Sequence, residues 1–144
     1  MRLLATASIA LLCLLIVVSA PASAQQDARL PVFDTAEDMR SELDRLMRDR
    51  DFVAVVERFS PPALMSIGRV RVLEDRYKQT LDPFDNSGHL VLETPADGVV
   101  REVVAYWAGD TYAYVYLLTH TREDGVRVLD FQISGDVRAI KDWW

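Results

Sequence analysis

The hydrophobic pattern of the chain changes its period near residue 89, and this change limits the folds that the chain can adopt. Between residues 35 and 81, apolar side chains recur every three or four positions, as on one face of a helix. From residue 89 onward they recur at every second position, as on one face of a strand. Helices followed by strands predict an α+β fold, in which N-terminal helices pack on a curved antiparallel sheet of four to five strands.

Three helices are expected before the change of period. The first spans about residues 36–48, with Thr35 as the residue that caps its N-terminus. The second lies in "DFVAVVERFS" and ends before Pro61 and Pro62, which cannot donate backbone hydrogen bonds. The third spans about residues 63–81 and precedes the loop sequence "DPFDNSG".

Five strand segments are expected after the change of period. The short sequences between them are rich in Gly and Asp, which favours tight turns and antiparallel hairpins. The segments are "HLVLET", "VVREVVAYW", "TYAYVYLLTHT", "VRVLDFQIS" and "VRAIKDWW".

The first 24 residues have the pattern of a secretory signal peptide. Arg2 precedes a long apolar run, and the small residues at 22–24 match a cleavage site. We therefore expect cleavage after Ala24, a flexible leader at residues 25–34, a single α+β domain at residues 35–144, and a periplasmic or secreted location. A retained membrane anchor is the alternative, because the apolar run at residues 3–18 approaches the length that spans a bilayer.

Composition excludes several classes of function. The single cysteine, Cys13, lies in the expected signal peptide, so the mature domain has no disulfide and no thiolate nucleophile. The formal net charge is −6 without a basic cluster, which disfavours nucleic acid and, after cleavage, a membrane as partners. His89 and His120 lie far apart without metal-site spacing, so no metal and no cofactor are expected.

Three tyrosines alternate in "TYAYVYLLTH", residues 111–120. Pairing across the turn at residues 122–125 places Tyr116 opposite Phe131 and Tyr114 opposite Ile133. Pairing across the turn at residues 109–110 places Trp107 opposite Tyr112. We therefore expect the tyrosines on the face of the sheet that the helices cover.

The opposite face of the sheet is also apolar in this register. Contiguous apolar patches often mark association surfaces, so a homodimer is expected through a second set of strand residues. These are Val104, Tyr106, Val115, Leu117 and Val128.

A ligand pocket is expected between the helices and the tyrosine face. The side chains expected to line it are Tyr77, Trp107, Tyr112, Tyr114, Tyr116 and Phe131. Arg101, His120 and Arg127 are expected at its rim, where they could orient an anionic ligand or transfer a proton. Because Asp130 points to the other face in this register, no residue is assigned a catalytic role.

The order of these elements resembles the nuclear transport factor 2-like, or ketosteroid-isomerase-like, α+β cone, and in particular its small secreted bacterial members of uncharacterised function. The segments that carry the resemblance are "DFVAVVERFSPP", "RVLEDRYKQTL", "YVYLLTHTREDGVRVLDFQIS" and "GDVRAIKDWW". The resemblance implies a cone whose mouth holds an apolar ligand, in a family of isomerases, dehydratases and non-enzymatic binding domains. A cystatin-like sheet around a single helix is the nearest structural alternative.

Two functions stay open at this point. The first is a secreted or periplasmic non-enzymatic domain that binds a small apolar ligand or a protein partner, as a homodimer. The second is a small cofactor-free enzyme, an isomerase or hydrolase, that uses Tyr114, Tyr116 and His120 in a tyrosine-lined cone. A carboxylate close to Tyr114 or His120 in an open pocket would favour the enzyme.

Overall fold

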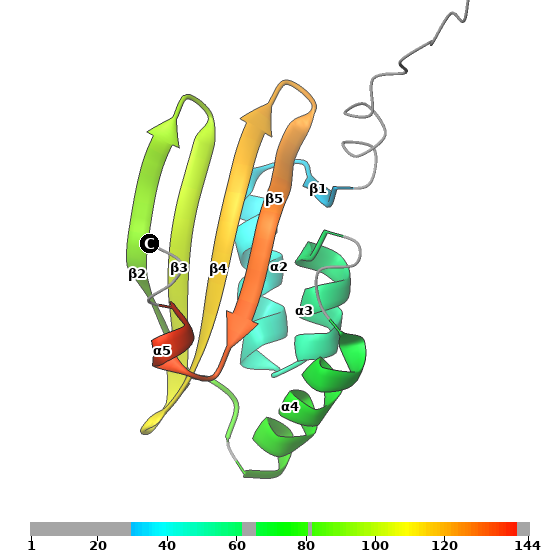
Figure 1. The fold of residues 1–144 in the computed structure, drawn as a ribbon, viewed down its shortest axis with the longest axis vertical. Coiled ribbons are helices and arrows are strands. Elements are labelled where there is room, and N and C mark those ends of the chain that lie inside the picture. The colour runs from blue at the N-terminus through cyan, green and yellow to red at the C-terminus, as the bar shows by residue number, and fades with distance from the viewer. Residues whose placement is uncertain (1–29, 62–65, 81, 141–144) are drawn as a thin grey trace, which may run out of the picture.

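The computed structural model describes residues 30–61, 66–80 and 82–140, and its architecture is α+β (Figure 1). The helices that precede the long strands are α2 (Ala36–Arg48), α3 (Phe52–Phe59) and α4 (Ile67–Thr80). The strands are β1 (Val32–Phe33), β2 (Asn86–Ala96), β3 (Val99–Ala108), β4 (Thr111–Arg122) and β5 (Gly125–Ser134), and a short helix α5 (Val137–Ile140) follows them.

The five strands form one curved, unclosed antiparallel sheet in the order β1-β5-β4-β3-β2. In Figure 1, α2 passes behind this sheet, whereas α5 lies in front of it. The predicted fold class is therefore confirmed. Four of the five predicted strand segments correspond to β2, β3, β4 and β5.

The helices form where the apolar stripes predicted them. The Thr35 hydroxyl accepts a hydrogen bond from the backbone N–H of Asp38 at 3.0 Å, which caps α2 as expected. α2 and α3 each turn one apolar stripe toward the sheet. The buried residues of these stripes are Met39, Leu43, Leu46, Met47, Phe52, Val55, Val56 and Phe59.

Strand β1 corrects the prediction of a flexible leader over residues 25–34, of which the structure describes 30–34. Phe33 pairs with Val126 of β5, and its side chain is only 3% exposed. The Phe33 ring stacks on Phe59 with centroids 4.9 Å apart, and the Arg58 guanidinium lies 3.6 Å from the Phe33 centroid. One buried aromatic residue thus anchors this segment, which has too few residues for a visible period.

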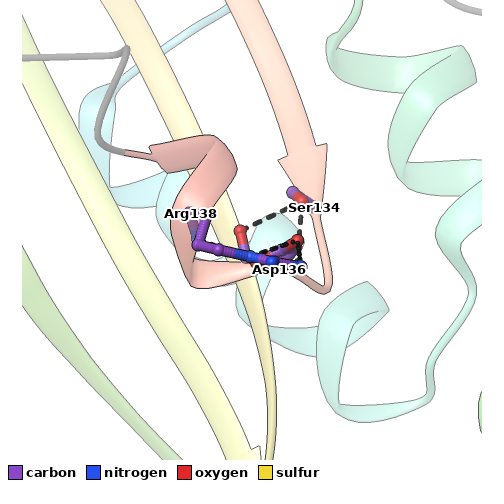
Figure 2. A network of polar contacts seen from close by, with 3 residues as sticks. All are labelled: Ser134, Asp136 and Arg138. Atoms are coloured by element: carbon purple, nitrogen blue, oxygen red, sulfur yellow. Dashed lines mark hydrogen bonds and ion pairs between the residues drawn. The ribbon is translucent and has the colours of Figure 1, made fainter.

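The predicted last strand, "VRAIKDWW", is wrong over its described part, because residues 137–140 form α5 instead. The Ser134 hydroxyl accepts from the backbone N–H of Asp136 at 3.0 Å, and the Asp136 carboxylate accepts from that of Arg138 at 2.9 Å (Figure 2). The Arg138 side chain also donates to Asp136, with Nη2 and Oδ2 2.8 Å apart. Asp136 therefore acts as the residue that caps a helix. Residues 141–144 lie outside the described part of the chain.

The pairing of β4 with β5 differs from the predicted register beyond one point. Near the turn, Arg122 pairs with Gly125 and Thr119 with Val128, as a regular hairpin requires. The register then shifts, because Leu118 pairs with Asp130 and leaves the intervening β5 residue as a β-bulge. A shift of one residue moves every later side chain of β5 to the opposite face relative to β4.

The tyrosines consequently lie on the face that α2, α3 and α4 do not cover. Tyr116 pairs with Gln132 and Tyr114 with Ser134, whereas Leu117 pairs with Phe131 and Val115 with Ile133. The predicted pairing of β3 with β4 is confirmed, and Trp107 lies opposite Tyr112. The prediction that the tyrosines face the helices is therefore wrong.

The strand residues predicted to form a homodimer surface belong instead to the core between helices and sheet. Their side chains are at most 2% exposed and pack in the same cluster as the apolar stripes of α2 and α3. A homodimer through these residues is therefore excluded by their burial, and any dimer would use a different surface. The residues are Val104, Tyr106, Val115, Leu117 and Val128.

Leucine-to-alanine substitutions on β4 and β2 test this assignment of faces. Leu117 is fully buried against the helices, so Leu117→Ala should lower the free energy of unfolding by about 3 kcal/mol. Leu90 is 48% exposed, so Leu90→Ala should change it by less than about 0.5 kcal/mol. Urea unfolding followed by circular dichroism measures both. Equal unfolding midpoints for the two variants would contradict the placement of Leu117.

Candidate functional site

A cavity of about 340 Å³ lies between the first turns of α2 and the inner face of the sheet. Its helical wall consists of Ala36, Glu37, Met39 and Arg40. Its sheet wall crosses four strands, from the edge strand β2 through β3 and β4 to β5. The residues of the sheet wall are His89, Leu92, Val100, Glu102, Thr119, Thr121 and Val126.

The strand register explains why these side chains meet on one face. Leu92 pairs with Glu102, Val100 pairs with Thr119, and Thr121 pairs with Val126. Each pair is directly cross-strand, so both members point to the same side of the sheet. That side is the one that α2 covers, and the cavity lies where the helix begins.

Glu102 is the buried charged residue of this site, with 3% of its surface exposed. Its Oε2 accepts a hydrogen bond from Nη2 of Arg40, which α2 contributes. Nε2 of His89 lies 3.3 Å from the same oxygen. A buried carboxylate requires such partners, because an unpaired charge in the protein interior is costly.

The polar cluster continues from the cavity into the core. Arg40 and Asp44 lie one turn apart on α2, and Asp44 Oδ1 accepts from the Tyr106 hydroxyl at 2.6 Å. Tyr106 is fully buried, and burial, followed by the hydrogen bond to Asp44, raises its pKa far above the ordinary value. These hydrogen bonds join α2 to β3 and β2.

One nitrogen of the cluster is not satisfied. Nη1 of Arg40 is buried and has no hydrogen-bond partner among the described residues. The Arg40 side chain as a whole is 24% exposed. Arg40 also belongs to the cavity lining.

The six residues predicted to line one pocket do not come together. Tyr77 and Phe131 lie in the core between helices and sheet. Tyr114 and Tyr116 belong to a second cluster on the opposite face, with Trp107 packed against it. Tyr112 stacks on Tyr114 with centroids 6.0 Å apart. The Tyr77 hydroxyl donates to the Tyr112 carbonyl at 2.8 Å, which ties α4 to the turn between β3 and β4.

The three predicted rim residues also lie away from the cavity. His120 and Arg127 are cross-strand partners, so they lie close together as expected. Nη2 of Arg127 is 2.5 Å from Asp124 Oδ2, and Arg101 pairs with Glu93 of β2. These arginines are therefore already used in ion pairs on the sheet.

One sequence pattern indicates this site, but it was not interpreted so because the helices were predicted to cover the other face of the sheet. "VVREVVAYW" places Glu102 in phase with Val104 and Tyr106, so an acidic residue shares a face with apolar ones. That face is covered by helices, and a carboxylate there needs a cation from the covering helix. Arg40 supplies it from the first turns of α2.

Two further properties concern the part of the chain that the structure describes. No three His, Cys, Asp or Glu side chains converge there as metal ligands. None of its helices combines the length and the apolar character that crossing a bilayer requires.

Fold and site together define an α+β domain with an open cavity between a helix and a sheet. Comparison of the chain with protein-family models, curated proteins and solved structures returns no match.

Glu102→Gln tests the ion pair at the centre of the site. The change leaves the Arg40 guanidinium without a countercharge, so the free energy of unfolding should fall by about 3 kcal/mol. Glu93→Gln removes the matching carboxylate of the solvent-exposed pair with Arg101 and should leave the unfolding midpoint unchanged. Chemical denaturation of both variants compares them. A Glu102→Gln variant as stable as Glu93→Gln would contradict a buried pair.

The buried tyrosines predict that the free energy of unfolding decreases at alkaline pH. Burial raises the pKa of Tyr106, and of Tyr77, Tyr114 and Tyr116, above the ordinary value of about 10. Above about pH 10 the unfolded chain therefore loses protons that the folded chain keeps, so the free energy of unfolding falls as pH rises.

Tyr106→Phe should make this decline less steep between about pH 10 and 12, and it should cost about 1 kcal/mol at neutral pH through the lost hydrogen bond. Tyr112→Phe, which removes an exposed hydroxyl, is the matched control. Urea unfolding at stepped pH measures both slopes. An unchanged slope in Tyr106→Phe would contradict the burial of its hydroxyl.

Proposed function

We propose that the chain is a non-enzymatic binding domain that holds a small, largely apolar molecule in the cavity between α2 and the sheet. The observation that carries the proposal is the cavity itself, about 340 Å³ with mainly apolar walls. Ligand sites have volumes of about 300–1,000 Å³ and combine apolar walls with a few polar groups. Met39, Val100 and Val126 supply apolar wall, and His89 and Glu102 supply the polar groups.

The exposed side chain of Leu92 supports a ligand at this place. Leu92 lies on the edge strand β2, lines the cavity and is 63% exposed. An apolar molecule in the cavity would remove part of this surface from water, at about 25 cal/mol for each Å² buried. The mouth of the cavity at β2 is therefore where we place the entrance.

Binding without chemistry is favoured because the buried acidic group of the cavity, Glu102, is already engaged. Oε2 of Glu102 accepts from Arg40 and faces His89. Tyr114, Tyr116 and His120, which a tyrosine-based enzyme would use, belong to the other face of the sheet. The resemblance to the nuclear transport factor 2-like cone and the pattern of a signal peptide support a periplasmic or secreted binding domain of that family.

A cofactor-free enzyme is the second candidate, supported by one observation. The His89 ring lies 3.3 Å from a buried carboxylate at the cavity wall. An imidazole that a carboxylate orients is the arrangement of many general bases. Recovery of a bound molecule in chemically unchanged form after incubation with the protein would favour the binding domain over this enzyme.

Matched valine-to-phenylalanine variants test the cavity. Val100 lines it, so Val100→Phe should fill part of its volume and weaken binding of the neutral probe N-phenyl-1-naphthylamine at least about tenfold. Val72 is 63% exposed on α4, so Val72→Phe should bind the probe as the unsubstituted protein does. Fluorescence titration measures affinity, and native mass spectrometry reports retained molecules and oligomeric state. Equal affinity in all three proteins would place the probe elsewhere and overturn the proposal.

A further inference from the structure

We infer that the molecule held in the cavity is a neutral apolar alcohol, with its hydroxyl group directed to His89 and its hydrocarbon part against Met39, Val100 and Val126. This inference rests on the proposed function, and it adds the chemical class and the orientation of the ligand. Three features carry it: the positions of the polar side chains on the cavity wall, the contact of His89 with Glu102, and the charges that line the cavity.

Three polar side chains of the cavity wall contact one another. His89 and Glu102 lie on β2 and β3, and Arg40 covers them from α2. Val100 of β3 and Val126 of β5 supply apolar wall, and Thr119 and Thr121 of β4 lie between these strands. The hydroxyl of Thr119 donates to the Val100 carbonyl at 3.4 Å. We therefore place the polar end of the ligand at His89 and its apolar part against Met39 and these valines.

The contact between His89 and Glu102 determines which polar group of a ligand can bind to His89. When the imidazole is neutral and Nε2 donates to the Glu102 carboxylate, Nδ1 is the ring nitrogen that accepts a hydrogen bond. The His89 side chain is 44% exposed and lines the cavity, and we assign the ligand to Nδ1 because Nε2 faces Glu102. A group that donates a hydrogen bond satisfies Nδ1, whereas a carbonyl, an ether or a carboxylate cannot.

The charges around the cavity disfavour an anionic ligand. Two carboxylates, Glu37 and Glu102, and one guanidinium, Arg40, line it. With a neutral imidazole the walls carry one excess negative charge, which would repel a carboxylate on the ligand. The unsatisfied nitrogen of Arg40 does not change this balance, because Nη1 is buried.

Competition with three probes of nearly equal size tests the inference. The probes are 1-octanol, octanoate and methyl heptyl ether, each displacing N-phenyl-1-naphthylamine from the intact protein at pH 8. The alcohol should displace the dye at a concentration at least about tenfold lower than octanoate. It should also be preferred over the ether by about fivefold, as one hydrogen bond implies.

The His89→Phe variant tests the assigned partner, with His120→Phe as the control on the opposite face of the sheet. His89→Phe should abolish the preference of alcohol over ether while the dye still binds, and His120→Phe should keep it. Octanoate that competes as well as octanol, or a preference that survives His89→Phe, would overturn the inference and leave the binding domain standing. Failure of all probes and of the dye to bind would overturn the proposed function itself.

Discussion

The β-bulge in β5 decides which side chains of the sheet face the helices. Before it, Thr119 pairs with Val128, and after it Leu118 pairs with Asp130, so Leu129 is the extra residue. Phe131 and Ile133 thereby join Leu117 and Val115 on the side that α2 and α3 cover. Because the side chains of a strand alternate, one added residue is sufficient to exchange the two faces. The core beyond the bulge and the separation of the tyrosines from Phe131 and Ile133 depend on this exchange, whereas Thr121 and Val126 of the cavity wall pair on the other side of the bulge.

The cavity exists because polar groups interrupt the apolar contact between α2 and the sheet. Beyond the first turns of α2, Leu43 and Met47 pack into the core with no exposed surface. At the start of the helix, Arg40 meets Glu102 instead, and two partners satisfy the carboxylate. Close apolar packing would bury this charge without compensation, whereas an open cavity keeps Arg40 and His89 partly in water. The same cluster stabilises the contact between helix and sheet and supplies polar groups to the cavity wall.

Local patterns in the sequence predicted the elements well, since each depends on residues close together in the chain. Thr35 indicated the start of α2, and the Gly-Asp pair at residues 109–110 indicated the hairpin of β3 and β4. The bulge had no such signal, because a regular hairpin and a bulged one place equally apolar residues on both faces. Asp136 was interpreted as a turn residue although it also fits a helix cap, and β1 is too short to show a period.

The candidate site was missed for a related reason. Its residues come from α2, β2, β3, β4 and β5, and only the correct faces bring them together. Arg40 and Glu102 are 62 residues apart in the chain, so neither predicts the other locally. A charged residue in phase with apolar neighbours was the available signal, and it needed the position of α2 to be interpreted.

Strand β2 forms one edge of the sheet, and its sequence makes this edge a poor template for another strand. Pro95 lacks a backbone N–H, and the pairing of β2 with β3 is irregular between His89 and Val91 and between Glu93 and Ala96. Such features oppose edge-to-edge association of chains. The border of the sheet next to Leu92 is thereby protected from a strand that would add to it and close the cavity. A long exposed edge and an accessible interior can then coexist in one small domain.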